Sequence, residues 1–282
     1  MIYRSQIPQP PLRGIVDVLW HYEGYAPPHS FERVLPSGTL ELVINLRNED
    51  LRIYDSEMTG RWRTYRGALL SGVQSGFTVI NTAQQERIMG VHFRPGGAFS
   101  MFGIPADIFC DNHVTLGTLW GAEEEEEIRE RLALASDADE RLRLLEAELL
   151  RRTKSVNGMH PAIRHALAGF GQRPDPASVG HAADLVGLSA RRFIELFRRY
   201  VGVTPKLYCR IRRFQRALGE LHRIKQMDWS AVALECGYYD QSHFIRDFRQ
   251  FSGLTPSAYR DIRGSIEPVP EPERGQICPI PG

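Results

Sequence analysis

The chain has 282 residues, of which 42% are hydrophobic and 24% charged, as in an ordinary globular protein long enough for two domains. No apolar run approaches the length of a membrane span, the N-terminus lacks a secretion signal, and the four cysteines form no C-x-x-C pair, so we expect a cytoplasmic protein. The net charge of +1 conceals an uneven distribution: residues 161–264 hold 17 Lys and Arg against 9 Asp and Glu, whereas the remainder balances at −7. A basic C-terminal half favours binding to a polyanion.

Residues 1–153 are predicted to form a β-rich domain with flanking helices. Short apolar runs at 40–45, 69–70, 77–80 and 87–93 alternate with glycine and proline, which is typical of strands joined by turns. A short helix is expected near 99–109, and the pattern turns helical over 122–153. There Leu142, Leu145 and Leu149 form an amphipathic stripe, which could cover the β domain or pair with its copy in a second chain.

The second half is predicted to be all-helical. Residues 154–160 read as a linker, residues 160–264 as a helical domain, and residues 265–282, with five prolines, as a disordered tail. The expected fold class is therefore α+β, with a β-rich N-terminal domain and a C-terminal domain of two helix-turn-helix units joined by a long helix.

Those two units are predicted from one pattern that occurs twice. Ala183, Gly187 and an aromatic pair at 193 and 197 precede Gly-Val-Thr-Pro at 202–205, and the same residue types recur from Ala233 to Pro256. The offset is 50 up to Gly237 and 51 after it, so the second copy has one extra residue in its turn. An Ala-x-x-x-Gly segment that turns into a helix with aromatics four residues apart is typical of a helix-turn-helix.

Polar side chains are expected to face outward on the second helix of each unit. Ser189 and Asp240 are predicted N-caps. The helix over 205–222 between the units is basic, and its arginines could reach phosphates or pair with nearby acids. A rigid connector that separates the two second helices by about 34 Å would let them enter successive major grooves of one duplex.

The stretch GYYDQSHFIRDF at 237–248, continued by GLTPSAYR at 253–260, carries a resemblance. The segment from about Ser178 to Arg260 resembles the DNA-binding domain of the AraC/XylS family of bacterial transcription regulators. That resemblance implies a sequence-specific regulator whose partner is double-stranded DNA, with RNA polymerase as a further candidate partner.

The resemblance also implies which residues contact DNA. The residues expected to contact base edges are Arg191, Ile194, Glu195, Gln241, Ser242, His243 and Arg246. The residues expected to contact phosphates are Ser189, Arg198, Lys206, Arg210 and Arg249. Ile194 could meet a thymine methyl group or pack against a neighbouring element, and Glu195 is a departure, because an acid near phosphates is repulsive unless it accepts from a cytosine amine.

The N-terminal half resembles an uncharacterised β-rich domain found in front of this module. The similarity is carried by RVLPSGTLELV at 33–43 and GVHFRPGGA at 90–98, and it implies a cupin-like barrel. Such a domain could bind a small-molecule effector, or it could serve only for homodimerisation and polymerase contact.

A catalytic N-terminal domain is the competing hypothesis. A metal-dependent barrel needs clustered histidines and a carboxylate, but His21, His29, His92 and His113 are dispersed and no H-x-H pair occurs. His92 is expected to be a strand residue with a satisfied partner, and Arg94 to form a structural salt bridge. We therefore expect no enzymatic activity, no catalytic residue, no metal, no cofactor and no membrane partner.

Overall fold

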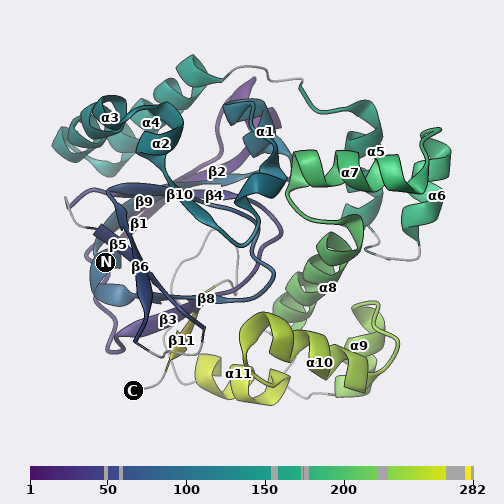
Figure 1. Ribbon diagram of the computed structural model, residues 1–282. Helices are drawn as coiled ribbons and strands as arrows, with labels where there is room; N and C mark the ends of the chain where they lie inside the picture. Colours follow the sequence, from purple (N-terminus) through teal and green to yellow (C-terminus); the bar gives the residue numbers. More distant parts are fainter. Residues whose placement is uncertain are drawn as a thin grey trace.

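Two antiparallel sheets form the N-terminal domain (Figure 1). The computed structural model describes residues 1–47, 50–56, 60–153, 158–172, 174, 178–221, 228–264 and 277–280. The six-stranded sheet has the order β1 (Ile2–Gln6), β2 (Val16–Glu23), β9 (Arg87–Phe93), β4 (Glu41–Asn45), β7 (Ala68–Ser71) and β10 (His113–Thr115). The five-stranded sheet has the order β11 (Ile277–Ile280), β3 (Phe31–Val34), β8 (Thr78–Asn81), β5 (Asp50–Tyr54) and β6 (Trp62–Arg66).

The inner strands of the six-stranded sheet are largely buried on both faces, and successive side chains point to opposite faces. In β4, Leu42 and Ile44 belong to the large core under the helices, whereas Val43 faces the five-stranded sheet. In β9, Met89 and Val91 likewise belong to that core. This alternation leaves a cavity between the sheets, lined by the opposite set of side chains.

Short helices and two long ones complete the N-terminal domain. Their bounds are η1 (Leu12–Gly14), η2 (Thr82–Gln85), α1 (Gly97–Phe102), η3 (Ala106–Phe109), α2 (Leu116–Trp120), α3 (Ala122–Leu134) and α4 (Ala138–Arg152). Helix α4 packs on β1, β2 and η1. Its stripe of Leu142, Leu145 and Leu149 is at most 2% exposed, so the stripe covers the sheet of its own chain.

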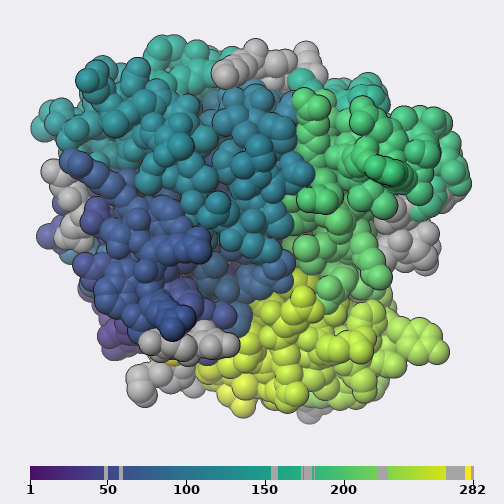
Figure 2. All heavy atoms as spheres, in the orientation of Figure 1, coloured from purple at the N-terminus to yellow at the C-terminus, as the bar shows by residue number. Residues whose placement is uncertain are grey.

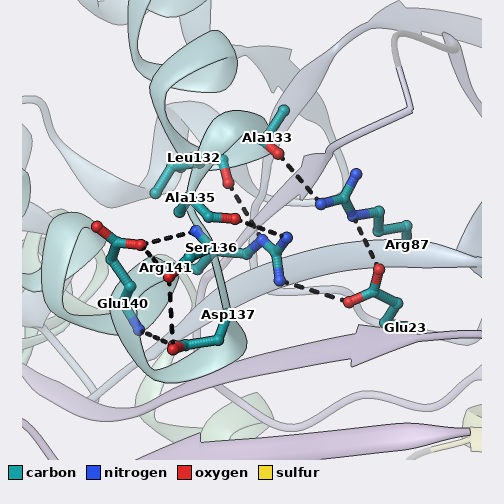
Figure 3. Close-up of polar contacts among 9 residues, drawn as sticks. All are labelled: Glu23, Arg87, Leu132, Ala133, Ala135, Ser136, Asp137, Glu140 and Arg141. Carbon is teal, nitrogen blue, oxygen red and sulfur yellow. Dashed lines mark hydrogen bonds and ion pairs between the residues drawn. The ribbon is translucent and has the colours of Figure 1, made fainter.

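A polar network fastens α3 and α4 to the six-stranded sheet (Figure 3). The buried Arg141 guanidinium donates to the carbonyls of Leu132 and Ala135 and to Glu23 of β2. Arg87 of β9 donates to the carbonyl of Ala133 and pairs with the same glutamate at 3.4 Å. The carbonyls that α3 leaves open at its C-terminal end are thereby satisfied by two arginines rather than by water.

The C-terminal domain is helical, as predicted. Its helices are α5 (Pro161–Gln172), α6 (Ser178–Leu185), α7 (Ala190–Val201), α8 (Pro205–Leu221), α9 (Trp229–Glu235), α10 (Gln241–Ser252) and α11 (Pro256–Gly264). Helix α8 runs between the pair α6–α7 and the pair α9–α10, which lie near its two ends (Figure 1). The predicted α+β fold class and the predicted long connecting helix are confirmed.

Aromatic side chains form the interior of each helical unit. Phe197 lies 5.6 Å from Tyr208 in the first unit, and Phe248 lies 5.5 Å from Tyr259 in the second, between ring centroids. Four phenylalanines of the repeat, at 193, 197, 244 and 248, are fully buried. The duplicated sequence therefore builds two cores with the same packing of a phenylalanine against a tyrosine.

The helical domain lies along one side of the β domain, and the two are in contact (Figure 2). Helix α7 packs on η3 and α1, where the rings of Phe99 and Tyr200 are 4.5 Å apart. Gln215 of α8 donates to the carbonyl of Pro36 at 2.5 Å. One continuous core of buried residues consequently runs through both domains.

The tail prediction was wrong for four residues. Ile277–Ile280 form strand β11, which pairs antiparallel with β3 and contacts α11. Arg263 of α11 donates to the carbonyl of Ile277 at 2.8 Å. A sequence rich in proline can supply an edge strand, because an edge strand leaves one row of N–H groups without ladder partners. The rest of the predicted tail lies outside the described residues, as do 154–157 of the predicted linker.

No helix in the described part of the chain is both long and apolar enough to cross a membrane.

Candidate functional site

The turn of each helix-turn-helix unit is fixed by a glycine and a capping side chain. Gly187 and Gly237 have φ values of +66° and +83°, a region that favours glycine. Ser189 lies two residues after Gly187 and accepts a hydrogen bond from the backbone N–H three positions on, at 3.3 Å. Asp240 lies three residues after Gly237 and accepts the corresponding hydrogen bond at 2.7 Å. The two predicted N-caps are confirmed, and the extra residue of the second copy lies in its turn.

We call α7 and α10 the recognition helices. The same three residue types end each of them and begin the helix that follows. Gly202 and Gly253 end these helices with φ values of +99° and +72°. The hydroxyls of Thr204 and Thr255 then cap the next helix at 3.3 and 3.1 Å, and proline takes its first position. Glycine, threonine and proline thus act in order as helix stop, cap and first helical residue.

The first recognition helix presents a paired acid. Arg191 is 90% exposed and its Nε lies 3.0 Å from Glu195 Oε1, while Arg192 lies 3.6 Å from the other oxygen. The hydrogen bond from Arg191 lowers the pKa of the Glu195 carboxyl. Ile194 is partly exposed. The acid that looked out of place near phosphates is therefore accompanied by two arginines.

The second recognition helix brings together three exposed polar side chains near its N-terminus, Gln241, Ser242 and Arg246. His243 is turned more inward: its Nε2 lies 3.8 Å from Asp247 Oδ2, and its ring meets the Tyr238 ring edge-on at 5.3 Å. Three of the four predicted base-contacting residues of α10 are thus placed in solvent.

The predicted phosphate-binding residues differ in their surroundings. Lys206 and Arg249 are exposed, and Arg198 is half-exposed with a contact of 3.7 Å to Asp107 of the β domain. Ser189 serves as the N-cap of α7. Contact of these side chains with DNA stays a prediction.

Arg210 has a different role in the structure. Its guanidinium binds the Asp247 carboxylate through two hydrogen bonds of 2.8 and 3.2 Å and donates to Gln250 at 2.5 Å. Asp247 is 2% exposed and also lies 3.9 Å from the buried Arg213. The connecting helix and the second recognition helix are therefore locked together by a buried ion pair, one of the alternatives that the sequence left open for the arginines of α8.

Both recognition helices meet the β domain with their C-terminal ends. Gly202 lies against Ala106 of η3, and Gly253 lies against the ring of Phe77. The N-terminal ends, which carry the exposed polar residues, point away from these contacts. The β domain consequently leaves open the helix ends that a duplex would approach.

A second candidate site is the cavity of about 100 Å³ between the two sheets. Its walls carry apolar and aromatic side chains with a few polar ones, among them Glu32, Glu41, His92 and His113. Burial lowers the pKa of both His92 and His113 to about 4. Sequence reasoning missed Glu32, because its neighbours in β3, Phe31 and Arg33, give no local sign that the carboxylate is buried.

The expected partners of two N-terminal residues are present. His92 Nε2 lies 3.3 Å from Glu41 Oε1, directly across the β4–β9 ladder. Arg94 pairs with Asp17 at 3.0 Å. Burial and the neighbouring Asp111 raise the pKa of the Cys110 thiol to about 11, which disfavours the nucleophilic thiolate. Among the described residues no three His, Cys, Asp or Glu side chains form a group that could hold a metal ion.

Comparison with known families agrees with the two halves of the chain. Residues 182–262 match the helix-turn-helix domain family, and residues 4–115 match a domain family of unknown function, DUF6597. The C-terminal domain is an AraC-type helix-turn-helix domain, as the sequence predicted.

Some individual relatives match about a third of the chain, and others match most of it. An uncharacterised helix-turn-helix-type transcriptional regulator of Haemophilus influenzae is 35% identical over 99 residues, which are 35% of this chain and 33% of the relative. The chain thus spans about a third of the length of that curated relative. An AraC-type transcriptional regulator of Chromobacterium violaceum is 28% identical over 36% of this chain and 92% of its own, with a TM-score of 0.33. ToxT of Vibrio cholerae is 6% identical over 93% of this chain and 98% of its own, with a TM-score of 0.45.

The buried ion pair gives a first prediction. Asp247→Ala should lower the free energy of unfolding by about 3–5 kcal/mol, because it leaves Arg210 and Arg213 without a counter-charge in the interior. Urea unfolding followed by circular dichroism measures the loss. Glu195→Ala in the first unit is the matched control and should leave the midpoint nearly unchanged, since its arginine partners are exposed. Equal loss in the two variants would contradict a buried, structural pair.

The cavity histidines give a second prediction, on pH. The folded-state pKa of His92, about 4, is below its ordinary value of 6.5, so the unfolded chain takes up the proton first as the pH falls. This contribution to stability is complete above pH 6.5 and is lost as the pH falls towards 4. When the pH is lowered from about 7 to about 5, the free energy of unfolding falls in the wild type partly because of this histidine. In His92→Gln that fall should be smaller by about 2 kcal/mol, since the variant lacks the titrating group. Urea titrations at the two pH values check this, with the exposed His165→Gln as control; a loss in His92→Gln equal to that of the wild type would refute it.

Proposed function

We propose that this protein is a sequence-specific DNA-binding transcription regulator that acts in the cytoplasm and is controlled by a small ligand bound to its N-terminal domain. The observation that carries the proposal is the pair of matched helix-turn-helix units, each with a capped recognition helix whose polar N-terminal end is exposed. The two units are held at the ends of one helix, α8, so they can act together on a single duplex.

Charge supports a nucleic acid as the partner of this domain. Exposed Arg191, Arg246 and Arg249 belong to the recognition helices, and exposed Lys206 opens the connecting helix. Arginine can pair with guanine in two hydrogen bonds, and glutamine with adenine. The proposed base contacts are those predicted from the sequence, with Arg191, Gln241, Ser242 and Arg246 favoured by their exposure.

The cavity between the sheets supports the proposed control by a ligand. It lies in the domain that contacts the C-terminal ends of both recognition helices, so a ligand that shifts the cavity walls can alter the spacing of the two units. A homodimer formed through the N-terminal half would use a surface other than the leucine stripe of α4, which is buried. Contact with RNA polymerase belongs to the same proposal, whereas an enzymatic activity does not.

Binding to chromosomal DNA fragments tests the function. The purified full-length protein should select a small set of fragments, with an affinity that falls steeply as salt rises because phosphate contacts release counterions. Sequencing of the retained fragments, followed by footprinting, locates the sites relative to promoters. The proposal fails if all fragments compete equally at physiological ionic strength.

Two arginines of the same helix separate base contact from phosphate contact. Arg246→Ala should weaken specific binding by about 1–3 kcal/mol and relax the preference at one base pair. Arg249→Ala should weaken binding to specific and random DNA alike and reduce its salt dependence. Mobility-shift titrations on the selected fragment and on random DNA make the comparison. An equal loss on both DNAs for Arg246→Ala would assign it to the phosphates.

A further inference from the structure

The cavity between the sheets has an unusual combination of lining groups. Most of its wall is apolar, and three aromatic side chains, Trp20, Tyr22 and Tyr25, cluster on one side. Two carboxyl groups, of Glu32 and Glu41, also line it, whereas no lysine or arginine does among the described residues. Burial keeps the imidazoles of His92 and His113 neutral at neutral pH, since it lowers their pKa to about 4.

Glu32 is the distinctive member of this set. It lies in β3, where alternation points its side chain into the cavity and that of Arg33 to the other face of the sheet, against the ring of Phe77. Glu32 is 1% exposed. Its Oε1 accepts from the hydroxyl of Tyr25 and lies 2.7 Å from Nε2 of His29.

The second oxygen of that carboxyl group has no hydrogen-bond partner. Glu32 Oε2 is buried and unpaired in the described structure, and so is Nδ1 of His92 on the facing sheet. A buried carboxylate oxygen without a donor costs free energy comparable to the loss of a hydrogen bond to a charged group. A ligand in the cavity that carries a hydrogen-bond donor would satisfy this oxygen.

The aromatic side chains indicate that the donor group of the ligand is positively charged. The rings of Trp20 and Tyr22 are 5.4 Å apart, and those of Tyr22 and Tyr25 are 6.1 Å apart. Electron-rich ring faces attract a cation, most strongly where water is excluded. The carboxylate and the aromatic rings therefore both attract a positively charged group.

We infer that the cavity binds a small organic ammonium ion, with its charged group on Glu32 Oε2 and its hydrocarbon or aromatic body against the apolar walls. An anionic ligand would meet two carboxyl groups without a compensating lysine or arginine, so carboxylic acids are disfavoured. The volume of about 100 Å³ selects for small bodies, since an apolar cavity of about 150 Å³ holds benzene. The inference deepens the proposed control by a ligand and rests on it only for the effect on DNA.

Calorimetry and thermal unfolding of the full chain test the ligand class without DNA. The probes are propylamine and butylamine, each compared with its alcohol and its carboxylate of similar size. We expect at least one amine to raise the melting temperature in a concentration-dependent way and to bind at least tenfold more tightly than its alcohol, with no binding of the carboxylates. Tighter binding of an alcohol or a carboxylate, or binding of none of the probes, would overturn the inference.

Two isosteric variants locate the charge. Glu32→Gln should remove the tenfold preference for the amine, because the amide cannot balance the ammonium charge. Glu41→Gln makes the same change on the opposite wall and should keep most of the preference, since Glu41 lies at the His92 contact. The reverse order would overturn the assignment to Glu32. The comparison of amine with alcohol in the wild type needs neither variant to fold.

The outcomes for this inference and for the proposed function are separate. If no amine binds while the protein still selects chromosomal fragments, the proposed regulatory function is supported and only the inferred ligand class is refuted. If an amine binds but no DNA fragment is preferred, the inferred ligand class is supported and the proposed regulatory function is refuted. A change in fragment affinity on addition of the amine would join the two.

Discussion

Each helix-turn-helix unit depends on a pair of phenylalanines, four residues apart, buried against the tyrosine of the following helix. Phe193 and Phe197 supply this pair in the first unit, and Phe244 and Phe248 in the second. Burial of rings of this size dominates the stability of a small helical core. Because the pair occupies one face of the recognition helix, the residue two positions after its first member, Glu195 or Arg246, is exposed on the other face. The spacing that stabilises the core thus also determines which side chains are available to a ligand.

The ends of the helices matter as much as their faces. A helix N-terminus that points to solvent exposes unpaired N–H groups, and in both units a serine or aspartate side chain satisfies one of them. The matching glycine, threonine and proline at the exit fix where the next helix begins. Two units that share these rules hold their exposed ends in the same local geometry, although their exposed residues differ: one carries an acid between arginines, the other glutamine, serine and arginine.

Much of this could be predicted from the sequence because it follows from local rules. The repeat predicted the helices, caps and buried aromatics of the C-terminal domain, and apolar runs with turn residues predicted a β-rich N-terminal domain. Pairings between distant segments could not be predicted. Nothing local says that Arg210 of the connecting helix finds Asp247 of the second recognition helix, or that a proline-rich tail joins β3. Glu32 was missed for the same reason, since its burial depends on a facing sheet contributed by other strands.

Strand β11 adds a mechanical link to this arrangement. It forms the edge of the five-stranded sheet next to β3, the strand that holds Glu32, and Ile277 itself contributes to the cavity wall. It is also fastened to α11, the helix that follows the second recognition helix, through the guanidinium of Arg263. Strand β11 thus acts as a restraint between the cavity and the second helix-turn-helix unit. Its loss would expose the edge of β3 to pairing with another chain and would disconnect that unit from movements of the cavity walls.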